Sequence, residues 1–209
     1  MFYGKKWPAL LLAVMPLYAY AKNSIELPLA ITSESQKIAY NVSLDTLQIN
    51  VLYKITCRIN NFEHVNVKLL FEPRLLASSS YGNVELNGHP LPGNTSYLQT
   101  GQNQLTFRVL IEKEDTEKYN RFVLSNALET PYEVEQCLAY QQSPTSDALK
   151  TNMAANSDGG YFFAYNDTDR LVTIAVGNFW PTAYEIKPHD WKIVFVSTDN
   201  QNIHIKQIK

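Results

Sequence analysis

The sequence predicts a mainly β protein: an antiparallel, immunoglobulin-like (Ig-like) β-sandwich with one or two short helices and a single disulfide. Three observations predict this fold class. Apolar and polar residues alternate over long stretches, turn residues separate these stretches at the spacing typical of a sandwich, and the chain has only two cysteines, both beyond an export signal. With 209 residues, the chain is long enough to bury a core.

Residues 1–21 are typical of a Sec-type signal peptide. Lys5 and Lys6 supply the positive start, an apolar stretch follows, and Ala19-Tyr20-Ala21 forms the small-x-small cleavage site. The alternative is an uncleaved membrane anchor, although the apolar stretch is shorter than the ~20 residues that a spanning helix needs. We therefore expect export through the Sec pathway to the periplasm or cell surface, and no transmembrane segment in the mature chain.

The charge of the expected mature chain is mildly negative. Removing residues 1–21 takes away two lysines and no acids, so Lys+Arg falls from 18 to 16 against 20 Asp+Glu, a formal charge of −4. Because like charges form no block, nucleic acid is not an expected partner.

The mature chain is expected to begin with an alternating segment, residues 22–32. Its apolar side chains share one face and are candidates for strand donation: Ile25, Leu27, Leu29 and Ile31. In one interpretation the segment is an edge strand of its own sandwich, since Pro28 lacks a ladder donor. In the other it protrudes and completes a neighbour's sheet, as in donor-strand complementation. The second interpretation predicts protein partners that bind through an exposed sheet edge.

Residues 33–142 are expected to form the Ig-like sandwich. The clearest strand covers residues 49–60, where Cys57 points inward and Leu52 is the sole apolar residue on the polar face. Asn60-Asn61 suggests a hairpin to a strand over 65–71. Asn87-Gly88 predicts a type I′ turn, because both residues tolerate positive φ. Further strands are expected at 105–111 and 120–126.

Residues 130–142 change period and predict a short helix. The alternative is a strand, which would place Cys137 on the same side as Glu133 and Glu135 and is poor for a core. Thr130 with Glu133 makes a capping box, Pro131 takes the first helical place, and Cys137 lies on an apolar helical face. A disulfide between Cys57 and Cys137 would close a loop of about eighty residues and stabilise the fold by roughly 4 kcal/mol. The alternative is two unpaired buried cysteines.

Residues 143–209 form a β-rich C-terminal part, either within the same domain or as a small lobe. Residues 161–165 and 170–180 predict an aromatic-rich hairpin joined by the turn at 166–169, and strands follow at 190–197 and near the C-terminus. We find no internal repeat in the sequence.

No catalytic or metal-binding motif is present, so we expect neither enzymatic activity nor a cofactor. The four histidines stand alone and are expected to be solvated: His64, His89, His189 and His204. Trp180 and Tyr184 flank a predicted loop and are candidates for stacking on a glycan. Core packing is the expectation for other aromatic residues: Phe162, Phe179 and Trp191.

The arrangement of signal peptide, alternating extension and single Ig-like domain with one disulfide resembles that of chaperone–usher pilus subunits. The resemblance implies a fimbrial or adhesive surface protein, such as a minor pilus subunit or adhesin, that acts by strand complementation and loop-mediated binding. Two alternatives remain open: a periplasmic assembly factor or chaperone-like module, and a secreted hydrolase without a local motif.

Overall fold

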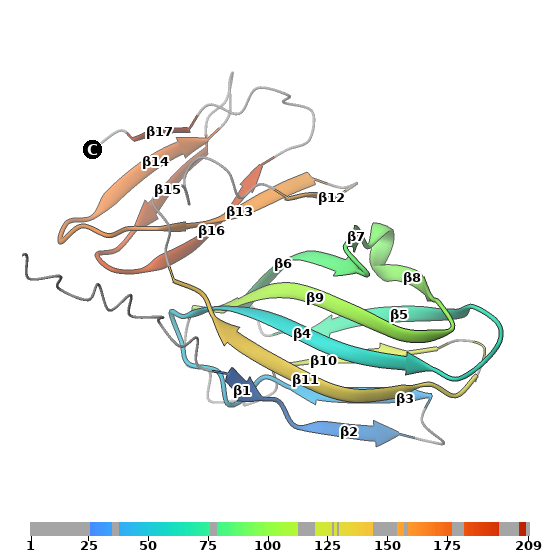
Figure 1. The fold of residues 1–209 in the computed structure, drawn as a ribbon. Helices are drawn as coiled ribbons and strands as arrows, with labels where there is room; N and C mark the ends of the chain where they lie inside the picture. Colours follow the sequence, from blue (N-terminus) through green and yellow to red (C-terminus); the bar gives the residue numbers. More distant parts are fainter. Residues whose placement is uncertain are drawn as a thin grey trace, which may run out of the picture.

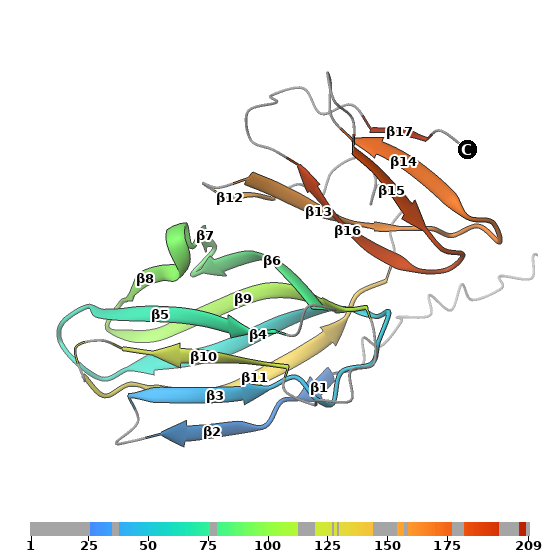
Figure 2. The same cartoon turned by 180° about the vertical axis from the view of Figure 1, so that it is seen from behind.

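The computed structural model describes residues 26–34, 38–75, 79–112, 120–126, 128, 130–143, 154–156, 159–176, 182–196 and 205–207. The described residues are mainly β, with antiparallel sheets and one short 3-10 turn at Pro92–Asn94 (Figures 1 and 2). The predicted mainly β class is therefore confirmed.

Two sheets form the first sandwich. Sheet 1 has the order β1 (Glu26–Pro28), β11 (Glu133–Gln141), β4 (Leu52–Asn61), β9 (Gly101–Ile111), β6 (Ser79–Leu86) and β7 (His89–Pro90). Sheet 2 has the order β2 (Ile31–Glu34), β3 (Ala39–Ser43), β10 (Arg121–Ser125), β5 (Val67–Arg74) and β8 (Thr95–Leu98). Both views show the two sheets stacked face to face.

Two smaller sheets form the C-terminal unit. Sheet 3 has the order β12 (Ala154–Asn156), β13 (Gly159–Tyr165) and β16 (Trp191–Val196). Sheet 4 has the order β15 (Thr182–Ile186), β14 (Val172–Val176) and β17 (Ile205–Gln207).

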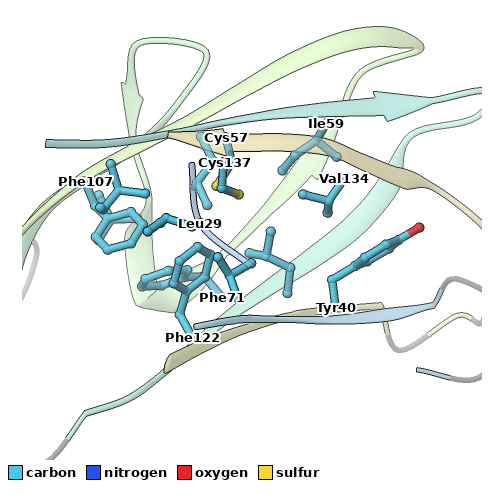
Figure 3. Close-up of a cluster of buried hydrophobic side chains, with 14 of the residues drawn as sticks. Leu29, Tyr40, Cys57, Ile59, Phe71, Phe107, Phe122, Val134 and Cys137 are labelled. Atoms are coloured by element: carbon cyan, nitrogen blue, oxygen red, sulfur yellow. A yellow bond between two sulfur atoms is a disulfide. The ribbon is translucent and has the colours of Figure 1, made fainter. Parts of the chain in front are cut away.

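The core of the first sandwich lies between sheets 1 and 2 (Figure 3). The inward side of β4 is buried as the alternation predicts, with Ile55, Cys57 and Ile59 fully covered. Three phenylalanines from three strands meet at the centre, with ring centroids 4.9 to 5.6 Å apart: Phe71, Phe107 and Phe122. Such aromatic contacts add to the free energy gained by burying the rings.

The predicted disulfide between Cys57 and Cys137 is confirmed. The two cysteines lie directly opposite each other on β4 and β11, and their Cα atoms are 4.1 Å apart. A close approach of this kind is typical of non-hydrogen-bonded antiparallel pairs. The bond therefore joins two neighbouring strands of one sheet at the core.

The predicted helix over residues 130–142 is wrong, because residues 133–141 form strand β11. The register of β11 against β4 shifts between Val134 and Gln136, so Glu135 is an extra residue in a bulge. The bulge restores the alternation after Glu135 and brings both Val134 and Cys137 inward. The three-residue spacing between Val134 and Cys137, which indicated a helix, is thus produced by a bulged strand.

Two predicted hairpins are also wrong. The chain after Asn60-Asn61 leaves sheet 1 and enters sheet 2, and the chain after 166–169 leaves sheet 3 and enters sheet 4. Alternation alone cannot distinguish a hairpin from a crossover between layers. The turn at Asn87-Gly88 is confirmed, since it joins β6 to β7 with φ of 53° and 78°.

The C-terminal unit repeats the strand pairing of the first sandwich, which the sequence did not reveal. In sheet 1, β4 lies between β11 and β9; in sheet 3, β13 lies between β12 and β16. In sheet 2, β5 lies between β10 and β8; in sheet 4, β14 lies between β17 and β15. Every one of these pairs is antiparallel. In chain order, β4, β5, β8, β9 and β10 therefore correspond to β13, β14, β15, β16 and β17.

A buried asparagine closes the crossover from β4 to β5 and the corresponding crossover from β13 to β14. In the first sandwich, Asn61 Oδ1 accepts the N–H of Glu63 at 3.0 Å, and its Nδ2 donates to the carbonyl of Val65 at 2.9 Å. The same Nδ2 also donates to the carbonyl of Leu98, the last residue of β8, at 3.4 Å. One amide thus holds the loop and ties β4 to a strand of the opposite sheet.

Asn166 makes the same contacts in the C-terminal unit. Its Oδ1 accepts the N–H of Thr168 at 3.0 Å, and its Nδ2 donates to the carbonyls of Arg170 at 2.7 Å and Ile186 at 2.9 Å. Ile186 is the last residue of β15, the counterpart of β8. A third buried asparagine, Asn126, closes the loop after β10. Its Oδ1 accepts the N–H of Leu128, and its Nδ2 donates to the carbonyl of Thr130.

The two units touch through an apolar cluster on the outward side of sheet 1. Leu52, the exception in the alternation of β4, lies with Leu110 against Phe163 and Trp191 of the C-terminal unit. The Nζ of Lys192 also lies 3.1 Å from a carboxylate oxygen of Glu112. The apolar residues on the polar face therefore mark the contact with the second unit.

We predict that Asn61→Ala lowers the free energy of unfolding by about 2–3 kcal/mol, because two carbonyls, one of them buried, and one N–H lose their partner. Urea unfolding followed by circular dichroism measures the change. Asn66→Ala is the matched control, because Asn66 is exposed in the same loop, and its change should stay within about 0.5 kcal/mol. Equal effects of the two variants would contradict the role of Asn61.

A tyrosine pair lies at one end of the core. Tyr40 donates its hydroxyl to the carbonyl of Tyr132 at 2.7 Å, and the ring centroids are 5.2 Å apart. The hydroxyl of Tyr132 is buried without a hydrogen-bond partner among the described residues. Burial and then the neighbouring Tyr40 raise the pKa of Tyr132 far above its ordinary value.

We predict opposite effects for the two phenol-to-phenyl changes. Tyr132→Phe removes an unsatisfied buried hydroxyl and should leave the stability unchanged or raise it by up to about 1 kcal/mol. Tyr40→Phe removes a donor from a buried carbonyl and should cost about 1–2 kcal/mol. Thermal unfolding of the two variants at the same pH measures the difference, and a clear loss of stability in Tyr132→Phe would refute the assignment.

Candidate strand-pairing site

The N-terminal segment pairs with both sheets of the first sandwich. Residues 26–28, which form β1, pair with β11 in register from Glu26 opposite Tyr140 to Pro28 opposite Leu138. The chain then crosses to sheet 2, where β2 pairs with β3. Two backbone hydrogen bonds frame the crossing: Leu29 N–H to the carbonyl of Cys137 at 2.9 Å, and Ser43 N–H to the carbonyl of Ala30 at 3.0 Å.

The candidate strand-donor residues contact the core of the same chain. Leu29 is buried, and Leu27 and Ile31 are half-buried against the same core cluster. Figure 3 shows Leu29 pointing toward the phenylalanine cluster. Ile25 lies outside the described residues. The apolar face of the segment thus fills the edge of the sandwich in this structure, and each of its two pairings covers only three or four residues.

The repeat shows which strand edges are covered in one unit and uncovered in the other. In the first sandwich, β11 is followed outward by β1, β9 by β6 and β10 by β3. β16 and β17, the counterparts of β9 and β10, are outermost strands of sheets 3 and 4 among the described residues. So is β12, which takes the place of β11 in the sheet but precedes β13 in the chain. A strand edge of this kind presents backbone donors and acceptors to an added strand.

Exposed apolar side chains gather on loops at the end of the first sandwich where β4 ends and β11 begins. Phe62 and Val65 are each 60% exposed in the loop after β4, and Leu128 is 66% exposed in the loop before β11. Both loops are held by buried asparagines, Asn61 and Asn126. Rigid loops that present apolar side chains are typical of contact surfaces, because little conformational entropy is lost on binding.

The candidate glycan-contact residues are not brought together in the described part of the chain. Tyr184 is half-buried on β15 and lies opposite Ile174 of β14, whereas Trp180 lies outside the described residues. Trp191 is buried, as expected for a core residue. The side chain of Phe162 and the whole of Phe179 lie outside the described part.

The described histidines are exposed. His64 and His89 are exposed, and His204 lies outside the described residues. His189 is exposed and its Nε2 lies 2.9 Å from a carboxylate oxygen of Asp169. In the part of the chain that the structure covers, no three His, Cys, Asp or Glu side chains are grouped closely enough to hold a metal ion. The described residues also contain no helix of the length and apolarity needed to cross a bilayer.

The asparagine loops and the repeat were missed from the sequence, although a signal exists. Asn61 and Asn166 each end an alternating stretch, and a valine that begins the next strand follows each of them after six residues. Neither the family models, the curated proteins nor the solved structures compared with this chain gave a match. The pairing of the N-terminal segment and the edges that stay uncovered in the described part of the C-terminal unit are therefore the basis for a functional proposal.

Proposed function

We propose that this chain is an exported, non-enzymatic surface or assembly protein, such as a minor pilus subunit or adhesin, that joins neighbouring chains by β-strand complementation. The strand donated would be residues 22–32, exchanged between copies. The observation that carries the proposal is that this segment completes both sheets of its own sandwich through pairings of only three and four residues. The export signal predicted for residues 1–21 supports the expected location at the periplasm or cell surface.

Strand exchange between the identical sheet edges of two copies needs no new kind of contact. A segment that leaves its own edge can occupy the same edge of a neighbour and rebuild the same hydrogen bonds and apolar contacts. Burial of a leucine such as Leu29 is worth about 1.5–3 kcal/mol, and it is recovered in the exchanged form. The free energy difference between the closed and exchanged forms is therefore small, and protein concentration decides between them.

The edges of the C-terminal unit that are uncovered among the described residues would supply a second means of growth. Because β17 corresponds to β10, an added strand beside β17 would take the place that β3 has in the first sandwich. The exposed apolar loops of Phe62, Val65 and Leu128 would supply the loop-mediated contact. Backbone pairing gives affinity in such assemblies, and the alternate side chains give register.

We predict that a Glu26→Cys, Tyr140→Cys variant forms disulfides between chains. The two positions are directly opposite on β1 and β11 and point outward from the core. Isotope-labelled and unlabelled mature chains are refolded together at high concentration and oxidised, and mass spectrometry then identifies the bridged peptides. Peptides that join a labelled to an unlabelled chain are expected at up to about half of all bridges, because a fully exchanged strand pairs with either copy at random.

A Thr56→Cys, Thr106→Cys variant is the matched control. These positions are directly opposite on β4 and β9, which belong to the fixed centre of sheet 1. The control should give bridges within one chain alone. If the Glu26 and Tyr140 positions also bridge within one chain alone under every concentration tested, the exchange proposal fails.

A further inference from the structure

Two cations lie directly opposite each other on the outward side of sheet 1. Lys54 of β4 pairs in register with Arg108 of β9, and both side chains point away from the core. Side chains in such positions are about 5 Å apart at Cβ, and like charges there destabilise a sheet. We call Lys54 and Arg108 the basic pair.

The basic pair stands in a row with an aromatic ring on one side and a glycine on the other. Tyr140 of β11 lies opposite Lys54, and Gly82 of β6 lies opposite Arg108. Gly82 adds no side chain beside the guanidinium, and its own backbone is buried. The row therefore offers two cations and one ring, of which Lys54 is exposed and Arg108 and Tyr140 are half-buried.

The C-terminal unit borders this row. The next outward pair along the same two strands, Leu52 and Leu110, is covered by Phe163 and Trp191, and β12 contacts β6. Arg108 is half-buried, and burial lowers its pKa, an effect that the charge of Glu85 opposes. A charge that is partly removed from water interacts more strongly with a counter-ion than an exposed one.

The nearby carboxylates do not neutralise the basic pair by direct contact. Glu85 lies opposite Thr106, diagonal to Arg108, and Glu26 lies at the end of the row beyond Tyr140. Among the described residues, neither carboxylate comes within ion-pair distance of Lys54 or Arg108.

Another cation on the same side of β4 behaves differently. The Nε of Arg58 lies 3.9 Å from Glu135 Oε2, and its Nη2 donates to Gln136 Oε1 at 3.0 Å. Lys192 likewise contacts Glu112. Arg58 and Lys192 thus have carboxylate partners, whereas the basic pair has no ion-pair partner in the part of the chain that the structure describes.

We infer that the basic pair binds an oxyanion, a sulfate or carboxylate group, and that Tyr140 packs beside the body of the ligand. Lys54 supplies a mobile ammonium and Arg108 a planar guanidinium that can donate two parallel hydrogen bonds to such a group. An acidic sugar combines this group with an apolar ring face suited to tyrosine. This site does not depend on strand exchange, so each proposal can fail without the other.

Thermal unfolding of the mature chain in sodium sulfate and in sodium chloride at equal ionic strength tests the oxyanion site. Sulfate should raise the Tm beyond chloride in the unaltered chain, and Lys54→Gln and Arg108→Gln should each remove most of that increment. In low salt without sulfate, Lys54→Gln should unfold at the same or a higher temperature, because it relieves the like-charge contact. That result also shows that the variant folds.

Arg58→Gln is the matched control, since it removes a cation that already has partners on the same side of the same strand. It should keep the sulfate increment. Titration with glucuronate and with glucose, followed by amide chemical shifts of Lys54, Arg108 and Tyr140, distinguishes the source of the oxyanion. Binding of glucuronate at least tenfold tighter than glucose supports an acidic sugar, and binding of sulfate alone supports a free anion. The inference would be overturned if sulfate raised the Tm of the unaltered chain no more than chloride does. It would also be overturned if Arg58→Gln lost as much of the sulfate increment as Lys54→Gln and Arg108→Gln.

Discussion

The fold depends on crossovers in which the chain leaves one sheet and enters the other. Backbone groups that are buried at such a crossover need hydrogen-bond partners. At the ends of β4 and β13 these partners are supplied by one side chain, the amide of Asn61 and that of Asn166. Each amide satisfies a loop N–H and two carbonyls, of which one belongs to a strand of the opposite sheet. Because buried polar groups must be paired, these two asparagines fix both the loop and the distance between the layers.

The sequence predicted the strands well where burial is one-sided, and it predicted their partners poorly. Alternation located β4, β9 and the inward Cys57 because a strand with one buried face must change polarity at every residue. It could not distinguish a hairpin from a crossover, since both leave the same alternation on each side of a short polar loop. The bulge at Glu135 produced the spacing of a helix, and only the register against β4 reveals the extra residue.

The outward side of sheet 1 shows what an exception to the alternation means. Leu52 broke the pattern in the sequence, and in the fold it is the contact point with Trp191 of the C-terminal unit. Lys54 and Arg108 did not break the pattern, because a cation is ordinary on a polar face. Their adjacency depends on register between strands that are distant in sequence, and no local pattern of either strand contains it.

The N-terminal segment contributes both to the core and to the edges of the two sheets. Its residue Leu29 is buried in the core, and its backbone pairs with an edge of each sheet. However, its hydrogen bonds cover only a few residues of the neighbouring strands β11 and β3. Such a strand has nearly the same free energy whether it pairs with its own chain or with a second copy, because an identical edge on the copy offers the same contacts. In the C-terminal unit the corresponding edges have no such strand among the described residues. Within the described ranges, the same strand arrangement therefore occurs with covered edges in the first sandwich and with uncovered edges in the C-terminal unit, and the proposed assembly by strand addition would use this asymmetry.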